Sequence, residues 1–451
     1  MPADYLDRLA TFVVDTRLED LDGSTVMAAK NVVLDTIGAM LAGSRLEENA
    51  KLALLVGEAG NGQGCTLVGH AGKAQPMMAA LSNATAGVSL EVDEGSRLGG
   101  GHPSIHVTPA AIAVGEDKGS TGKQVLESII AAYEVTSRVG GATTSRHEIH
   151  SHGTWGTIGA AVATARLMGF NAAGVKQSIN LAASMSPANT WTPCFEGATV
   201  RNLYPGRANL QGILAANLSR CGFTGVADGP ADVYSSVLGQ GFDPEQAVAG
   251  LGQRGEYRIQ QNYFKFHACC WYNHPVLDAV EDLLQKERFQ ASDVDHISVE
   301  APPMATTMDN PRPANMLAAK FSIPYAVASA VVHGATGVGA FYPQRVADRQ
   351  VLALAEKVEI HADEKMDLRR YDYPTARVTV TLTGGRSLKQ EVTAHRGDSR
   401  NPVTQKELHG KFLELSGETL GEERAGKVIE LVANLEQLEG IRELTVLLGA
   451  P

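Results

Sequence analysis

Several common signatures of function are missing from this 451-residue sequence. Its 39 lysines and arginines face 50 acidic residues, which gives a formal net charge of −11, and no basic run or basic–aromatic alternation occurs. We therefore expect no nucleic-acid partner, because such proteins concentrate positive charge on one face. The cysteines follow neither a disulfide framework nor zinc-ligand spacing; they are Cys65, Cys194, Cys221, Cys269 and Cys270.

Membrane signals are also scarce. No apolar run approaches the length of a membrane span, and the first residues are amphipathic and acidic, unlike a signal peptide. These absences predict a cytoplasmic protein without a membrane partner. Only 6% of the residues are aromatic while 47 are glycine, which is typical of closely packed helices of small residues. The length suffices for two domains.

Apolar periodicity predicts helices over most of the chain. A change of composition near residue 289 introduces strand-like patterns, including a hairpin that turns at Gly384–Gly385. We expect a small α+β unit, roughly residues 270–400, inserted in a helical chain whose C-terminal tail packs back on the first part. The predicted helices cover residues 3–16, 24–41, 47–58, 76–90, 109–116, 125–139, 155–169, 172–183, 206–221, 315–334 (broken near Pro324), 406–415 and 421–435.

Three histidines lie close together in one short segment, residues 147–152. The chain has 13 histidines, and His147, His150 and His152 lie within six residues, just before a predicted helix at 155–169 that Thr154 caps. Imidazoles can transfer protons near neutral pH, and a helix N-terminus favours an anion. The segment is a candidate site for proton transfer next to an anion; a solvated turn is the plainer alternative.

A second segment combines acids, a glycine turn and a histidine. Glu91 and Asp93 are followed by Gly99–Gly101 and by His102, and Thr108–Pro109 predicts the start of the next helix. A carboxylate near a basic group is one way to build an acid/base pair. An ordinary acidic loop with a helix cap explains the same residues, so both interpretations stay open.

Two further segments repeat this layout of basic or reactive side chains ahead of a helix. One holds Arg201 and Tyr204 before Pro205-Gly206. The other leads to Pro275 and contains Lys265, His267, Cys269, Cys270, Tyr272 and His274. Four such junctions suit a single pocket for a negatively charged ligand if they converge in space. Convergence is the hypothesis on which the functional prediction depends.

At these junctions the chain resembles the MmgE/PrpD family, which includes 2-methylcitrate dehydratases, cis-aconitate decarboxylases and iminodisuccinate epimerases. The resemblance implies a mainly α fold in which both chain ends form a large all-helical domain, residues 1–268 and 403–451, and residues 269–402 form an inserted α+β lid domain. It also implies a homodimer and metal-free, cofactor-free chemistry on small di- or tricarboxylates. The segments that carry it are DTIGAMLAG (35–43), EVDEGSRLGGGHPS (91–104), HSHGTWGTIGAA (150–161), VRNLYPGRA (200–208), YFKFHACCWYNHPVLDA (263–279) and AAKFSIPYAVA (318–327).

Candidate site residues carry over from the matching positions of that family. The catalytic candidates are Asp93, His102, His150, His152 and Cys270, and the substrate-binding candidates are Glu91, Arg201, Tyr204, Lys265 and His267. Cys270 stands where cis-aconitate decarboxylases have histidine, which argues against that reaction. A thiol whose pKa is lowered by nearby cations is an alternative acid/base at this position.

The residue types fit a lyase that removes a proton next to a carboxylate and eliminates water, as a 2-methylcitrate dehydratase does. Cations and N–H donors would stabilise the resulting carbanion without a metal. Epimerisation, isomerisation or decarboxylation of a related dicarboxylate in the same pocket is the first alternative. Two others are a metal-dependent hydrolase that uses His150, His152 and an acid, and a carboxylate-binding protein without catalysis.

Overall fold

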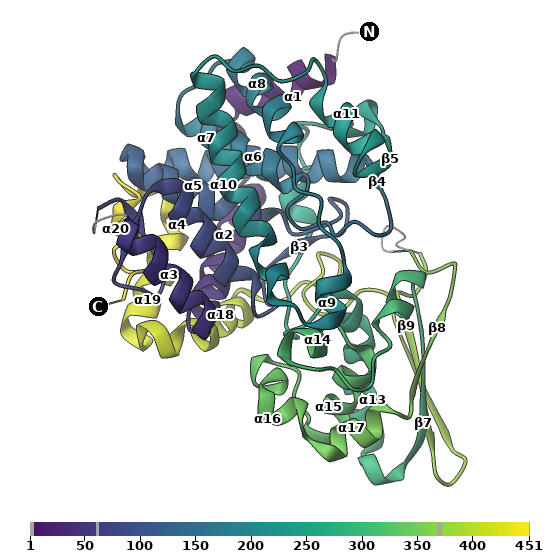
Figure 1. Cartoon of the computed structure of the whole chain (residues 1–451). Coiled ribbons are helices and arrows are strands. Elements are labelled where there is room, and N and C mark those ends of the chain that lie inside the picture. The colour runs from purple at the N-terminus through teal and green to yellow at the C-terminus, as the bar shows by residue number, and fades with distance from the viewer. Residues whose placement is uncertain (1–3, 60–62, 368–371, 451) are drawn as a thin grey trace.

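Helices dominate the computed structural model, which describes residues 4–59, 63–367 and 372–450 (Figure 1). The prediction of a mainly α fold is confirmed. The helices of the first part are α1 (Asp4–Asp15), α2 (Gly23–Gly43), α3 (Glu47–Ala59), α4 (Pro76–Val88), α5 (Pro103–Lys118), α6 (Gly122–Ala142), α7 (Gly156–Leu167), α8 (Ala172–Ser184), α9 (Thr192–Glu196), α10 (Leu203–Arg220), α11 (Gly229–Ser236) and α12 (Pro244–Val248).

Helix α2 lies at the centre of this part. Asp22 caps it by accepting a hydrogen bond from the Thr25 amide at 2.7 Å. At its other end α2 approaches α4 so closely that a Cβ on Gly43 would lie 1.8 Å from the carbonyl oxygen of Ala86. Among the described residues, α2 is the only helix long and apolar enough to cross a membrane, which corrects the expectation that no such run exists. Its most apolar window is 78% buried inside the protein, as a core helix is.

The C-terminal tail packs against α2. It forms α18 (Gln405–Leu420), α19 (Glu422–Ala433) and α20 (Arg442–Thr445). Figure 1 shows α18 and α19 beside α2, and α20 contacts α19 and α5. Lys411 of α18 forms a 2.5 Å ion pair with Asp35, the buried carboxylate inside the apolar run of α2. Phe412 lies against Gly38, whose Cβ would be 3.1 Å from the ring. Both ends of the chain therefore share one hydrophobic core.

A four-stranded sheet lies away from the helical part (Figure 1). Its strand order is β10-β9-β7-β8; β9 pairs antiparallel with β10 and β7, and β8 runs parallel to β7. The predicted hairpin is confirmed, and Gly385 supplies its left-handed turn residue at φ 78°. This region contains α13 (His274–Glu287), β7 (Val294–Ala301), α14 (Met316–Lys320), α15 (Ile323–His333), α16 (Pro343–Val346), α17 (Arg349–Ala355), β8 (Val358–Ala362), β9 (Ala376–Leu382) and β10 (Ser387–Val392).

The sheet and its helices enclose a second hydrophobic core, which also takes in residues of the helical part. Leu90 and Val92, just after α4, belong to this second core, as does Leu415 of α18. The segment around Glu91 therefore runs along the junction of the two cores. The domain boundaries expected at 268/269 and 402/403 stay predictions.

Three predicted helix starts are displaced by three residues or more: α6 begins at 122 rather than 125, α10 at 203 rather than 206, and α5 differs most. α5 begins at Pro103 rather than Pro109, and Pro109 lies inside it. Pro109 has no N–H to donate to the Ile105 carbonyl, as a helix would require. That carbonyl instead accepts a hydrogen bond from the Asn209 side chain at 3.0 Å. α7 begins at Gly156, one residue after the predicted start, but the predicted cap is wrong, because the Thr154 hydroxyl donates to the Ser151 carbonyl at 2.6 Å instead.

Candidate active site

A short strand pair brings distant segments of the chain together. Gly95 of β3 (Gly95–Ser96) pairs with Tyr263 of β6 (Asn262–Tyr263). The ammonium of Lys265, two residues beyond β6, consequently lies 2.9 Å from Oε2 of Glu91 and 3.6 Å from Oδ1 of Asp93. Two of the four predicted junctions thus meet at this ion pair.

Glu91 is the electrostatic centre of the site. Its carboxylate bridges Lys265 and Arg201, which lies in the 3-10 turn Thr199–Asn202 ahead of α10. Burial by itself raises the pKa of Glu91, but the charges of Arg201 and Lys265 outweigh it and hold that pKa below its ordinary value. Glu91 also has φ 56°, in the left-handed region that costs a non-glycine residue about 1–2 kcal/mol.

His102 and Asp93 form an acid–base pair. His102 is the N-cap residue of α5, and its Nδ1 lies 2.9 Å from the Glu94 carbonyl oxygen and 3.2 Å from Oδ2 of Asp93. Burial opposes ionisation of Asp93, but Lys265 and His102 lower its pKa far below the ordinary value. With two acceptors beside it, Nδ1 holds a proton, which leaves Nε2 as the nitrogen of His102 that can accept a proton from a substrate.

A stack of imidazoles extends from His102. The ring of His152 lies 4.4 Å from that of His102 and 5.1 Å from that of His150, centroid to centroid. His106, one turn into α5, accepts a hydrogen bond from the Gly153 amide at 2.9 Å and so holds the loop that carries His152. Burial lowers the pKa of His106 to about 4, and burial followed by nearby positive charge holds the pKa values of His150 and His152 well below the ordinary value.

Three nitrogens of this stack have no hydrogen-bond partner among the described residues, although the rings are buried. They are Nε2 of His150 and both Nδ1 and Nε2 of His152. Nδ1 of His150 accepts a bond from the His152 amide at 3.0 Å, so its Nε2 carries the proton. A buried polar group left unpaired costs about 1–3 kcal/mol, which favours a polar ligand at these atoms.

Three predicted residues lie around this centre rather than within it. His147 is exposed, with 76% of its side chain accessible, so the sequence cluster contributes only two of its three histidines. Tyr204 packs edge-on against His150 and donates to the Thr190 carbonyl at 3.2 Å. Both ring nitrogens of His267 are engaged elsewhere, by Thr336 at 2.7 Å and Asp278 at 2.9 Å.

Cys270 lies beside the charged centre but differs from the sequence prediction in its ionisation. Burial, and then the charge of Glu91, raise the pKa of Cys270 to about 11 against the opposing charge of Lys265. The expectation of a thiol that titrates near neutrality is therefore wrong. The geometry leaves Cys270 as a protonated thiol, able to donate a proton but not to act as a ready base.

The sequence analysis missed three residues of this neighbourhood. Trp191 lies 4.0 Å from His150 between ring centroids, His106 supports the loop of His152, and Lys320 donates to the Leu90 carbonyl at 2.6 Å. Lys320 lies within AAKFSIPYAVA, a segment used only as evidence of resemblance. His106 recurs four residues after His102, a spacing that places both on one helix face. Nothing local distinguishes Trp191.

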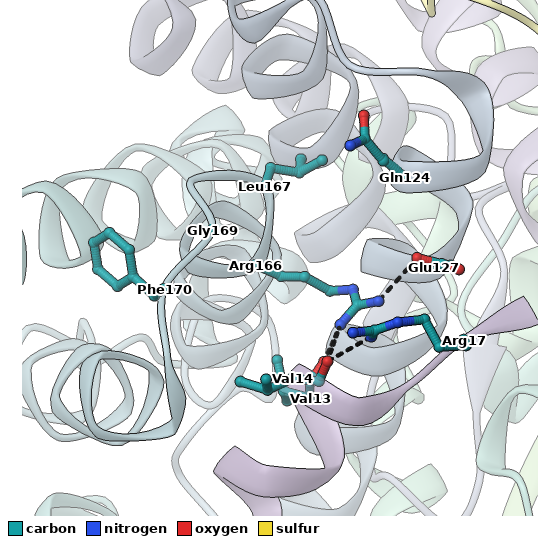
Figure 2. Close-up of a pocket in the computed structure, with 9 residues that line it drawn as sticks. All are labelled: Val13, Val14, Arg17, Gln124, Glu127, Arg166, Leu167, Gly169 and Phe170. Carbon is teal, nitrogen blue, oxygen red and sulfur yellow. Dashed lines mark hydrogen bonds and ion pairs between the residues drawn. The ribbon is translucent and has the colours of Figure 1, made fainter.

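The side chains of the centre are buried, and a cavity of about 420 Å³ beside them is lined by Val92, Lys265 and Lys411. Apart from His102, with 11% of its side chain accessible, the residues of the charged centre are almost fully buried. Figure 2 shows a cavity of about 410 Å³ between α1, α6 and α7. There Arg17 and Arg166 donate to carbonyl oxygens at the C-terminal end of α1, and Arg166 also pairs with Glu127. These polar groups therefore cap the end of the helix.

One set of side chains has metal-binding geometry. The ligand atoms of Asp93, His102 and His152 all lie within 4.8 Å of one another. His150, which the sequence analysis paired with His152 for a metal site, is not in this set. A second set, His267, Asp278 and Glu281, has its histidine nitrogens already engaged in hydrogen bonds.

Both parts of the chain match known protein families. Residues 7–240 match the family model of the MmgE/PrpD N-terminal domain, and residues 267–437 match that of the MmgE/PrpD C-terminal domain. The chain is 24% identical over 463 residues to the cis-aconitate decarboxylase of Aspergillus terreus, covering 96% of this chain and 93% of that protein. It is also 24% identical over 464 residues to the cis-aconitate decarboxylase of Homo sapiens, covering 99% and 94%.

Proposed function

This chain belongs to the MmgE/PrpD family, as its motifs predict, and we propose that it is a metal-independent, cofactor-free lyase for a small di- or tricarboxylate. The reaction removes a proton next to a carboxylate and eliminates water, as a 2-methylcitrate dehydratase does. The chain's similarity to lyases over nearly its full length supports the general class. The specific reaction rests on the site.

The observation that carries the proposal is the mixture of paired cations and unpaired imidazoles in one buried space. Arg201 and Lys265 share Glu91, while three nitrogens of His150 and His152 have no partner in the part of the chain that the structure describes. A polycarboxylate matches both features, since one carboxylate can share the cations and another can accept from the Nε2 proton of His150. Charge-assisted bonds of this kind gain strength where water is excluded.

The chemistry divides among these residues. Nε2 of His102 removes the proton, and its Nδ1 proton stays shared between Asp93 and the Glu94 carbonyl. Negative charge then develops on the adjacent carboxylate, where Arg201 and Lys265 stabilise it. The hydroxyl group leaves with a proton, and the protonated Cys270 thiol is a candidate donor. A positioned acid or base contributes about 10²–10⁴-fold to the rate.

A screen of acids tests the proposal. Purified protein is incubated with 2-methylcitrate, citrate, cis-aconitate and iminodisuccinate, and the products are followed by NMR in deuterated and ordinary water. We expect water elimination from a hydroxy acid and a raised melting temperature with its substrate, since a ligand that binds only the folded state stabilises it. Failure of every acid to react and to shift melting would contradict the proposal. Deuterium exchange without dehydration would favour epimerisation.

Decarboxylation is the second candidate function, because the relatives reported above carry that name. The same cations would stabilise the carbanion that remains when carbon dioxide leaves, and the protonated Cys270 thiol would return a proton to carbon. Carbon dioxide release from cis-aconitate would favour this reaction over dehydration. Replacing Cys270 with serine should slow either reaction, because the thiol is the proposed proton donor in both, so the identity of the product decides between them.

Metal-dependent hydrolysis is a third candidate, which the geometry of Asp93, His102 and His152 favours. Metal analysis of protein purified without a histidine tag tests it. Stoichiometric zinc, with activity lost to a chelator, would replace the metal-independent proposal. We expect neither, because Asp93 and His102 are already paired with each other.

Substrate must enter a buried centre, and the protein also has exposed apolar side chains. Since the centre is buried, we propose that residues 269–402 act as a lid that moves to admit the substrate. We also propose that the protein is cytoplasmic and that two copies of the chain form a homodimer. Exposed apolar side chains at both ends of α10 support covered surfaces there: Val200 and Leu203 at its start, and Phe223 and Val226 beyond its end. Light scattering of the purified protein tests the dimer.

A further inference from the structure

The segment that carries Glu91 is held at alternate carbonyl groups by buried cations. The Val88 carbonyl accepts from Arg201 at 3.4 Å, the Leu90 carbonyl from Lys320 at 2.6 Å, and the Val92 carbonyl from Lys411 at 2.8 Å. These cations come from three different parts of the fold. The left-handed backbone of Glu91 thus lies between two lysine contacts, at residues 90 and 92.

Lys320 differs from the other two cations because no carboxylate among the described residues is bound to it. Arg201 forms an ion pair with Glu91 and Lys411 pairs with Asp35, whereas the one hydrogen bond described for the Lys320 ammonium goes to Leu90. Lys320 is fully buried in α14, and its ammonium lies 5.6 Å from the centroid of the Phe341 ring. Its side chain reaches the Leu90 carbonyl, two residues beyond the end of α4.

The main chain of Lys320 contacts the other reactive segment. Its carbonyl oxygen accepts from the amide of Cys270 at 3.0 Å and from the side chain of Asn273 at 3.3 Å. One residue therefore fixes the backbone beside Glu91 through its ammonium and the backbone of Cys270 through its carbonyl. Displacement of Lys320 would move both groups relative to Arg201 and Lys265.

We propose that Lys320 is a positioning residue of the carboxylate site, which sets the direction of Glu91 and joins its segment to the Cys270 segment. This inference rests on the proposed function for its kinetic test, but its structural part does not. The role needs the charged ammonium, because a charged donor forms a stronger bond to a carbonyl than a neutral amine does.

The surroundings of Lys320 make its charge sensitive to pH. Burial lowers the pKa of Lys320 to about 7 against the opposing attraction of Glu91. The other charged or titratable groups that act on it are Lys265, Arg201 and Cys269. We therefore expect kcat/KM to fall as pH rises through about 7, when Lys320 loses its charge.

The kinetic test compares wild type with Lys320→Arg, which stays charged, and Lys320→Met, which never is. For 2-methylcitrate and cis-aconitate we expect a descending limb above about pH 7 in wild type, no such limb in Lys320→Arg up to pH 9, and at least tenfold lower kcat/KM at pH 6.5 in Lys320→Met. A limb unchanged in both variants would overturn the inference. Lys357→Met is the matched control, because Lys357 also donates to a carbonyl, that of Val294 at 2.7 Å, far from the site.

An unfolding experiment decides the structural part without turnover. A buried lysine with a lowered pKa binds its proton less readily in the folded state than in the unfolded state between about pH 7 and 10. The stability of wild type should consequently rise relative to Lys320→Met as pH increases through that window, and Lys357→Met should follow wild type. Parallel curves for wild type and Lys320→Met would overturn the inference, whereas wild type inactive on every acid would overturn the proposed function alone.

Discussion

Nδ1 of His102 lies 3.2 Å from Oδ2 of Asp93, within a chain of contacts that continues through Lys265 to Glu91. This contact keeps the proton on Nδ1 and leaves Nε2 as the base. His102→Asn should therefore lower kcat by about 10²–10⁴-fold with little change in melting temperature. Initial rates with the best substrate of the screen measure the loss. His147→Ala, which alters an exposed histidine of the neighbouring segment, should retain wild-type rates.

Asp93→Asn should leave His102 in place but make it a weaker base. An amide still accepts from Nδ1 but loses the negative charge that favours a protonated ring, so the base is weaker and the pH–rate profile shifts as well as falling. A loss that is identical at every pH would show that Asp93 only holds the backbone of its segment.

The ion pair of Arg201 with Glu91 predicts a strong non-additive effect on stability. Arg201→Met leaves the buried Glu91 carboxylate with Lys265 alone, and breaking a buried pair costs about 3–5 kcal/mol. Adding Glu91→Gln should recover part of this loss, because the uncompensated charge disappears. Urea unfolding of the wild type, both single variants and the double variant measures the coupling.

An exposed pair provides the control for that experiment. Arg312 and Glu356 form a 2.6 Å ion pair with 65% and 47% of their side chains accessible. Arg312→Met should cost about 0–1 kcal/mol, as exposed pairs do. A similar cost for Arg201→Met would mean that water screens the Glu91 pair, against its observed burial.

The sequence predicted the helical class, the hairpin and most of the charged centre, for local reasons. Apolar periodicity marks helices such as α2, and residues ahead of a helix start, such as His102 and Arg201, belong to recognisable motifs. The site depends on which side chain contacts which, and that is set by packing between distant segments. The pKa of Cys270 illustrates this, because the effect of burial and Glu91 exceeds that of the nearby cations.

The errors have tertiary causes. Thr108–Pro109 has the local pattern of a helix start, yet α5 begins six residues earlier. The helix can continue through Pro109 because the side chain of Asn209, from another helix, donates to the Ile105 carbonyl that proline cannot reach with an N–H. Lys320 could not be predicted as a site residue for a related reason. Its role depends on its contact with the Leu90 carbonyl, 230 residues away in the chain. No pattern within its own segment indicates that contact.

Glu94 makes stability fall as pH rises. Burial raises its pKa to about 8, against hydrogen bonds from the Tyr133 hydroxyl and the Ser104 amide. The folded state therefore holds a proton that the unfolded state releases near pH 4.5, so the stabilisation is complete below that pH and is lost as pH rises toward 8. In Glu94→Gln this loss should vanish, which denaturant unfolding at several pH values between 5 and 8 measures. A slope equal to that of wild type would assign the effect to other groups.

The bond from Asn209 to the Ile105 carbonyl predicts a rescue by a second substitution. Asn209 is fully buried, so Asn209→Ala leaves that carbonyl unpaired and should cost about 1–3 kcal/mol. Pro109→Ala restores the main-chain N–H that an α-helix directs at Ile105, and in that background Asn209→Ala should cost measurably less. Asn217→Ala, which removes a similar contact to a carbonyl inside α10, is the control and should cost the same in both backgrounds. Equal costs for Asn209→Ala in the two backgrounds would mean that its side chain does not replace the missing helix bond.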